Sequence, residues 1–136
     1  MEVDGSYLVA RTLKEEGVEH LFFLMGGPNY EIINNSEDFG IKTIDFRHEQ
    51  AASMAAHGYA RVTGRPGVTT AASGPGTLNL LTGQYTAFVD CAPMITLGGA
   101  GPISDFGRDG FQEIDQVGIM QPLCKYWHRP TSAARY

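Results

Sequence analysis

Charge and cysteine are both scarce in this chain of 136 residues, and each scarcity excludes a class of protein. Charged residues make up 18% against 43% hydrophobic residues, which is too little charge for a disordered chain and enough apolar material for a core. The net charge is −5 and no segment carries a basic stripe, so a nucleic-acid-binding role is excluded. The two cysteines, Cys91 and Cys124, form no CxxC pair, which favours reduced, buried thiols over a disulfide scaffold.

Long apolar runs are also missing. No run reaches the roughly 18 residues that a membrane span requires. The first residues, "MEVDGSYLVARTLKEEG", are acidic and amphipathic, unlike a signal peptide. We therefore expect a cytoplasmic protein with a single domain over residues 1–136. The closing residues, "TSAARY", are a weak signal for the end of a protein, so we also expect the chain to be a fragment or split subunit of a larger protein.

Glycine, by contrast, is abundant, and strand and helix patterns alternate between the glycine clusters. Such alternation predicts an α/β fold with three layers, a doubly wound parallel sheet with helices on both faces. The expected strands cover residues 20–25, 41–46, 67–72, 94–99 and 125–128. The expected helices cover residues 7–13 (with Gly17 as the stop), 30–34, 49–63, 77–89 and 112–117, and residues 100–110 are expected to form a surface loop.

Helical spacing also predicts which faces of two helices are apolar. In the helix 49–63, Ala52 and Ala56 are small enough to let another element come close. Tyr59 and Phe88 are expected to be core aromatics. The two predicted apolar faces consist of Ala51, Ala55, Gly58, Tyr59 and Val62 in one helix, and Leu78, Leu81, Tyr85 and Phe88 in the other.

Every unusual sequence cluster follows a predicted strand. "GGP" follows the first strand, "RHE" the second, "SGPG" the third and "GGAG" the fourth. The carboxyl ends of parallel strands lie at one edge of the sheet, and ligands of such sheets bind beyond that edge. We therefore expect a ligand site at this edge.

The "SGPGT" cluster has two interpretations. Backbone N–H groups at a helix start bind anions, so the loop is a candidate phosphate cradle. It lacks the P-loop lysine, however, and glycines that let a backbone approach a flat ring would look the same. Ser73 does not lie in a GxSxG elbow, so a serine hydrolase is not supported. No HExxH or cysteine–histidine grouping occurs, and we expect no metal site within this chain.

Glu49 is the single carboxylate in "RHEQAASMAAHGYAR". An acidic residue in the first turn of a helix is favoured by the helix dipole, which explains many such glutamates structurally. Here the glutamate also lies at the expected binding edge, with small residues behind it. A glutamate in such a place can share a proton with a ligand nitrogen, so Glu49 is also a candidate catalytic residue.

Four ordered motifs now point to a family. Together they resemble the N-terminal pyrimidine-binding (PYR) domain of thiamine-diphosphate enzymes. In chain order, the motifs are "RHEQAASMAAHGYARVTGRPGV", "SGPGTLN", "DCAPMITLGG" and "GFQEIDQVG". Within those enzymes, the nearest group is the acetolactate synthase superfamily. The resemblance extends from the first helix to Trp127.

The resemblance implies a role for individual residues. Glu49 matches the glutamate that hydrogen-bonds the pyrimidine N1′ of thiamine diphosphate and promotes the imino tautomer, which then generates the nucleophilic ylid. The remaining matches are Pro75, Asn79 and Gly26 at the cofactor, Gln112 at both cofactor and substrate, and Pro28 and Phe111 in the substrate pocket.

The resemblance also implies partners. In the family, a separate domain with a "GDG" signature holds the diphosphate and Mg²⁺, and this signature does not occur here. That domain belongs to a facing subunit, which implies a homodimer or homotetramer. The implied substrate is a small 2-oxoacid or an acyl-CoA.

Three functions remain open. "LMGGP", "LGG" and "PLCK" favour a 2-hydroxyacyl-CoA lyase or oxalyl-CoA decarboxylase type, which forms or cleaves a 2-hydroxyacyl-CoA. The alternatives are an acetolactate synthase or 2-oxoacid decarboxylase, which includes a split-subunit decarboxylase, and a non-catalytic binding module. His57 stands where relatives often carry an acidic residue, and we have no functional account of that change.

Overall fold

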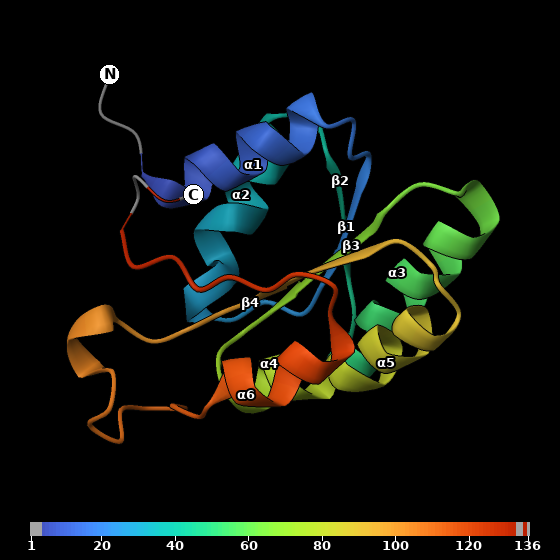
Figure 1. Cartoon of the computed structure of the whole chain (residues 1–136). Helices are drawn as coiled ribbons and strands as arrows, with labels where there is room; N and C mark the ends of the chain where they lie inside the picture. Colours follow the sequence, from blue (N-terminus) through green and yellow to red (C-terminus); the bar gives the residue numbers. More distant parts are fainter. Residues whose placement is uncertain (1–3, 133–134, 136) are drawn as a thin grey trace.

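The computed structural model describes residues 4–132 and 135. Its centre is a parallel sheet with the strand order β2-β1-β3-β4 (Figure 1). The strands are β1 (His20–Phe23), β2 (Lys42–Asp45), β3 (Gly67–Ala71) and β4 (Met94–Gly98). All neighbours pair in parallel, with Leu21 opposite both Thr43 and Val68. The expected parallel α/β sheet is therefore confirmed.

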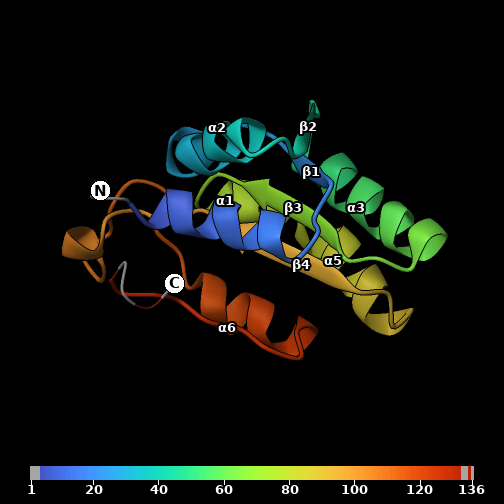
Figure 2. The same ribbon diagram turned by 90° about the horizontal axis from the view of Figure 1, so that it is seen from above.

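Two pairs of helices sandwich this sheet. The helices α1 (Gly5–Glu15) and α2 (Tyr30–Asp38) cover one face, whereas α3 (Glu49–Thr63) and α5 (Leu81–Val89) cover the other (Figures 1 and 2). Short elements complete the described chain: η1 (Gly27–Asn29), α4 (Pro75–Asn79), η2 (Ile103–Asp105), α6 (Gln116–Met120) and η3 (Gln121–Leu123). No helix in the described part of the chain is long and apolar enough to cross a membrane.

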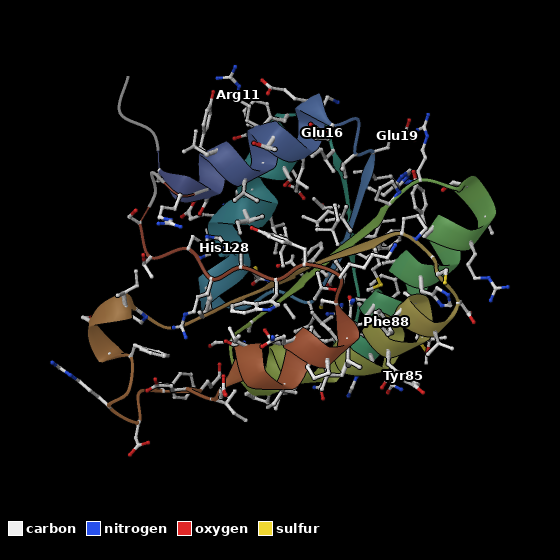
Figure 3. The ribbon with its side chains drawn as sticks, viewed as in Figure 1. Arg11, Glu16, Glu19, Tyr85, Phe88 and His128 are labelled. Carbon is white, nitrogen blue, oxygen red and sulfur yellow. The ribbon has the colours of Figure 1, made fainter. Side chains whose placement is uncertain are left out.

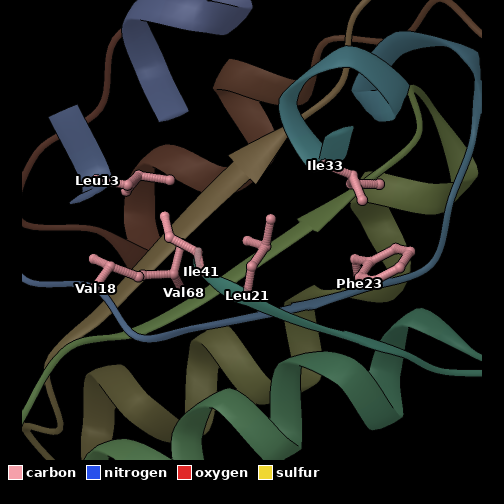
Figure 4. Close-up of a cluster of buried hydrophobic side chains, with 7 residues drawn as sticks. All are labelled: Leu13, Val18, Leu21, Phe23, Ile33, Ile41 and Val68. Atoms are coloured by element: carbon pink, nitrogen blue, oxygen red, sulfur yellow. The ribbon is translucent and has the colours of Figure 1, made fainter. Parts of the chain in front are cut away.

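The hydrophobic core follows the period-two pattern of β1. Leu21 and Phe23 point to the α1–α2 side, and Phe22 points to the α3 side. Burial of these apolar groups away from water is the main driving force that holds the layers together. The cluster on the α1–α2 side consists of Leu13, Val18, Leu21, Phe23, Ile33, Ile41 and Val68 (Figure 4).

On the opposite side, α3 lies close to its neighbours because small residues face them. Ala52 and Ala56 are fully buried, as expected from the sequence. A Cβ atom added to Gly67 of β3 would lie 2.0 Å from the carbonyl oxygen of Ala56. One added to Gly83 of α5 would lie 2.3 Å from Ser53 Oγ. The backbones of three elements therefore meet where any larger residue would be excluded.

Some sequence predictions were wrong. The expected strand at residues 125–128 does not form, and the helix expected at 112–117 lies at Gln116–Met120. The helix expected at 77–89 is divided into α4 and α5, and α2 extends past residue 34 to Asp38.

The predicted apolar faces of α3 and α5 were wrong as well. Val62 is 88% exposed and Phe88 is 44% exposed, so Phe88 is not a core residue. The sequence misled because the residues that the two helices bury are small or polar, whereas several large apolar ones lie in solvent. Tyr59 is half-buried and packs near Phe22, with 5.8 Å between the ring centroids. The residues that α3 and α5 bury are Ala52, Ser53, Ala56, His57, Ala60, Gly83, Gln84 and Ala87.

Candidate functional site

The carboxyl ends of β1, β3 and β4 open into one cavity of about 1830 Å³. Single ligand pockets usually occupy roughly 300–1,000 Å³, and this cavity is larger because it continues along β4 to residues 123–130. The sequence-predicted site residues all line this cavity, although they come from four separate segments. They are Gly26, Pro28, Glu49, Pro75, Asn79, Phe111 and Gln112.

Glu49 is the first residue of α3 and lies at the edge of the sheet where the strands have their carboxyl ends. His48 caps the helix, with its Nδ1 accepting a hydrogen bond of 3.1 Å from the backbone N–H of Gln50. The Nδ2 of Asn79 donates to Oε2 of Glu49 over 2.9 Å, which fixes the orientation of the half-buried carboxylate. Asn79 ends the short helix α4, so the "GPGTLN" segment folds its asparagine back onto the glutamate.

The second carboxylate oxygen of Glu49 faces a glycine. Oε1 lies 3.4 Å from the place that a Cβ of Gly76 would occupy, and within the described residues it accepts no hydrogen bond. A carboxylate oxygen needs a donor, and an oxygen without one at the surface of a cavity can accept a hydrogen bond from a ligand. The site thus offers one oriented acceptor, and no side chain of residue 76 covers it.

Arg47 does not compete for this carboxylate. Its side chain is 95% exposed and pairs with Asp45 at 3.3 Å, at the end of β2. The nearest strongly charged neighbour in sequence therefore points into solvent.

The loop after β1 is organised by Asn29, which sequence reasoning missed. Asn29 is almost completely buried, and its Oδ1 accepts a hydrogen bond of 2.8 Å from the N–H of Gly26. Its Nδ2 donates to the carbonyl of Leu24 over 3.2 Å. The loop packs so tightly that a Cβ on Gly26 would lie 2.5 Å from the Cβ of Ala72. The asparagine that follows "GGP" was the available signal, because asparagine favours turns.

The "SGPG" loop does not have the form of a phosphate cradle. Pro75 has no N–H group, and the N–H of Gly76 donates to the carbonyl of Ser73 over 3.3 Å. Gly74 faces the protein, since a Cβ there would lie 2.5 Å from the carbonyl oxygen of Gln112. Pro75 and Gly76 therefore offer no free N–H group to a phosphate, and Gly74 packs against the neighbouring segment.

Phe111 and Gln112 approach the site from the segment of residues 100–115, hereafter loop 100–115. This segment contains the surface loop that the sequence predicted, and Phe111 is 87% exposed. Glu113 holds the loop: its carboxylate accepts hydrogen bonds from the N–H groups of Gly107 (2.6 Å) and Gly110 (3.0 Å). These two bonds lower the pKa of the Glu113 carboxyl, because they favour its charged form.

The two cysteines differ in their surroundings. Burial raises the pKa of the Cys124 thiol, which keeps it protonated at neutral pH. Cys91 is exposed, so the expectation that both thiols are buried was wrong for this residue. The described residues contain no group of three or more His, Cys, Asp or Glu side chains that could hold a metal ion.

Comparison with known proteins agrees with this geometry. Residues 3–119 match the family described as "Thiamine pyrophosphate enzyme, N-terminal TPP binding domain". An acetolactate synthase large subunit of Lactococcus lactis subsp. lactis is 48% identical over 90% of this chain and 21% of its own length. An acetolactate synthase of Arthrospira platensis is 45% identical over 91% of this chain and 22% of its own length.

A relative with a different activity is also similar. A 2-hydroxyacyl-CoA lyase of Arabidopsis thaliana is 37% identical over 90% of this chain and 22% of its own length. The chain thus spans about a fifth of the length of the curated relatives that it matches. The family match covers most of the sequence, and it includes the strands, the helix of Glu49 and the loops at the cavity. The chain therefore belongs to the family of N-terminal TPP-binding domains of thiamine pyrophosphate enzymes.

Proposed function

We propose that this chain is the pyrimidine-binding, cofactor-activating part of a thiamine-diphosphate-dependent enzyme that forms or breaks carbon–carbon bonds. The observation that carries the proposal is the carboxylate of Glu49 at the cavity. Asn79 holds one of its oxygens at 2.9 Å, and the other faces the bare backbone of Gly76. The family of the chain supplies the identity of the ring that this oxygen would meet.

The residues present fit a flat ring with a hydrogen-bond donor. Glu49 would accept a hydrogen bond from the ring nitrogen N1′, while Asn79 keeps the carboxylate in place. Pro75, Gly26 and Gln112 would form the walls around the ring, since all three line the cavity. When bound, thiamine diphosphate supplies a nucleophilic carbon, and its thiazolium ring serves as the electron sink. The role of Glu49 is to hold a proton at N1′, in a place that the cavity walls shield from bulk water.

The diphosphate and its Mg²⁺ belong, in this proposal, to the diphosphate-binding domain of a facing subunit. Exposed apolar side chains on the outer face of α5 support such a partner. Tyr85 and Phe88, labelled in Figure 3, are 56% and 44% exposed, and Val89 is 58% exposed. Large apolar groups gathered on one helix are typical of a surface that another domain covers. This surface is consistent with the predicted homodimer or homotetramer. The oligomeric state and the cytoplasmic location both stay predictions.

For the reaction, the relatives favour the acetolactate synthase type, which acts on a 2-oxoacid. Two acetolactate synthases share 45% and 48% identity with this chain, against 37% for the 2-hydroxyacyl-CoA lyase. The lyase type remains the second candidate, because the motifs "LMGGP" and "LGG" favour it. This chain covers only 22% of the length of either type of relative, so the choice between the two reactions stays a proposal.

Replacement of Glu49 tests the cofactor-activating role. In the complete enzyme, Glu49→Gln keeps the size of the side chain but removes the carboxylate. We expect the exchange of the thiazolium C2 proton of bound cofactor, followed by NMR in D₂O, to slow by about 100-fold or more. Unchanged exchange in Glu49→Gln would reject the proposal. Glu37→Gln is the matched control, because Glu37 lies on α2 outside the cavity lining.

Calorimetric titration tests the need for a second domain. We expect thiamine diphosphate with Mg²⁺ to bind the 136-residue chain poorly, because only the pyrimidine part of the site is present. Addition of a chain that carries the "GDG" domain should restore tight binding. Tight, Mg²⁺-dependent binding by this chain alone would contradict the proposed division of the site.

A further inference from the structure

Ser73 is a buried polar residue at the cavity that the proposed function does not use. It lies in the loop after β3 and is only 3% exposed. Its Oγ donates a hydrogen bond of 3.0 Å to the Oε1 of Gln112, a residue 39 positions further along the chain. This bond connects the "SGPG" loop to loop 100–115.

The backbone of Gln112 is held in the left-handed region. Its φ is +57°, a conformation that is unfavourable for a residue with a side chain and persists only where the surrounding structure holds it. A close contact with Gly74 explains how this backbone conformation is maintained. Gly74 has a φ of +56°, and a Cβ there would lie 2.9 Å from the Cβ of Gln112. The backbone of the "SGPG" loop therefore packs directly against Gln112.

The hydrogen bond also decides which end of the Gln112 amide faces the cavity. A carboxamide has an oxygen that accepts and an NH₂ group that donates, which lie in one plane on opposite sides of the Cγ–Cδ bond. Ser73 takes the oxygen, and within the described residues the Nε2 of Gln112 makes no hydrogen bond. Gln112 lines the cavity, so its NH₂ group remains as a donor for a ligand.

We propose that Ser73 is a positioning residue that fixes the Gln112 amide so that its NH₂ group donates to a carbonyl or carboxylate oxygen of the substrate. The inference rests on the proposed function, since it needs a substrate next to the activated cofactor. It adds a specificity element: the site selects a ligand with an acceptor oxygen at this place. Without the hydroxyl of Ser73, the amide can rotate by 180° and present its own oxygen, which repels such a ligand.

An NMR experiment on the 136-residue chain tests the orientation without any activity. The probe is the ¹⁵N–¹H resonance pair of the Gln112 side-chain amide, assigned by comparison with Gln112→Ala. In Ser73→Ala we expect these resonances to shift and their exchange with water to change. Ser36→Ala is the control, since Ser36 is fully buried but its Oγ donates to the carbonyl of Ile32 within α2. Gln112 resonances that do not respond to Ser73→Ala would overturn the proposal.

A double-mutant cycle in the complete enzyme tests the link to the substrate. With pyruvate as the probe 2-oxoacid, we expect Ser73→Ala to raise KM about 3- to 10-fold, because one oriented hydrogen bond is lost. In the Gln112→Ala background, the same change should have no further effect. A purely structural serine would lower activity equally in both backgrounds, and that additivity would also overturn the proposal.

Two further outcomes separate this inference from the proposed function. Ser73→Cys keeps a weak donor of similar shape, so its effect on KM should lie between those of the unmodified enzyme and Ser73→Ala. It also allows the test to be made if Ser73→Ala does not fold. If Glu49→Gln leaves cofactor exchange unchanged while the Ser73 and Gln112 effects are coupled, the proposed function fails and the positioning role stands. If Glu49→Gln stops exchange while the effects are additive, the positioning role fails alone.

Discussion

The two sides of the cavity are built in different ways. Glu49 heads α3, a helix of 15 residues that rests on the fully buried Ala52 and Ala56. Phe111 and Gln112 lie on loop 100–115, where the short helix η2 has only three residues. Close packing of backbones holds the helix beneath Glu49, whereas loop 100–115 is held mainly by the hydrogen bonds of Gln112 and Glu113.

This difference matches the proposed roles of the two sides. Activation of a cofactor requires a carboxylate at a fixed place, and a helix on a packed sheet provides it. Contacts with a substrate differ between enzymes that share a cofactor, and loops tolerate such changes better than core elements do. We therefore expect changes beneath α3 to affect the whole fold and changes in loop 100–115 to act locally.

Gly67→Ala should have the largest effect. A Cβ at residue 67 would lie 2.0 Å from the carbonyl oxygen of Ala56, a backbone atom that cannot move without α3. We expect the free energy of unfolding, measured with guanidinium chloride, to fall by about 3 kcal/mol or more.

The matched control for this change is Gly58→Ala in α3, the helix against which Gly67 packs. A Cβ there would meet nothing within 4 Å, and alanine is the better helix former. The free energy of unfolding should therefore rise by about 0.5–1 kcal/mol. Equal losses from Gly67→Ala and Gly58→Ala would show that close packing under α3 is not what stabilises this side.

Asn79→Ala should have the next largest effect, and on activity more than on stability. It removes the 2.9 Å hydrogen bond that orients the carboxylate of Glu49. We expect kcat of the complete enzyme to fall about tenfold, equivalent to roughly 1.4 kcal/mol. Asn35→Ala is the control, because Asn35 lies on α2, away from the cavity lining. A normal kcat in Asn79→Ala would mean that the helix alone orients Glu49.

Glu113 should make the order of loop 100–115 depend on pH. The N–H groups of Gly107 and Gly110 lower the pKa of its carboxyl in the folded state. Its contribution is therefore present above the pKa of the unfolded chain and is lost as the pH falls through the lower folded value. We expect amide exchange of Gly107 and Gly110, followed by NMR, to lose protection in this acidic range.

The matched variant for this titration is Glu113→Gln. An amide cannot supply the charged acceptor, so the two glycine amides should exchange quickly at every pH tested. Protection that falls with pH in Glu113→Gln as it does in the unmodified protein would assign the transition to another group.

Gly101→Ala should have the smallest effect. Gly101 lies in loop 100–115, and a Cβ there would meet nothing within 4 Å. The free energy of unfolding should stay within about 0.5 kcal/mol of the starting value. A loss as large as that of Gly67→Ala would remove the distinction between the two sides of the cavity.

Several features were predictable from sequence because they depend on local patterns. The helix at 49–63 was predicted with its observed bounds, because Glu49 begins it and Gly64 adopts the left-handed φ of +70° that ends it. The four strands of the sheet were predicted to within two residues at their ends. The convergence of the predicted site residues on one cavity followed from the rule for parallel strands.

Other features failed because apolar spacing does not say which face is covered. Val62 and Phe88 follow a helical period, yet the structure exposes both and buries the small Ala60 and Ala87, which fit where backbones pack closely. Residues 125–128 look like a strand, but no strand of the described chain pairs with them. Pairing depends on a neighbour, and a local pattern carries no information about that neighbour.

The sequence by itself determined the parallel sheet, the edge at which the site lies and the carboxylate that heads α3, because these depend on strand order and helix boundaries. The tertiary structure alone decided the contacts that orient this site. Asn79 meets Glu49 across 30 residues, and Ser73 meets Gln112 across 39. Such contacts depend on distances of about 3 Å between remote segments, and these distances are set only when the layers of the fold pack together.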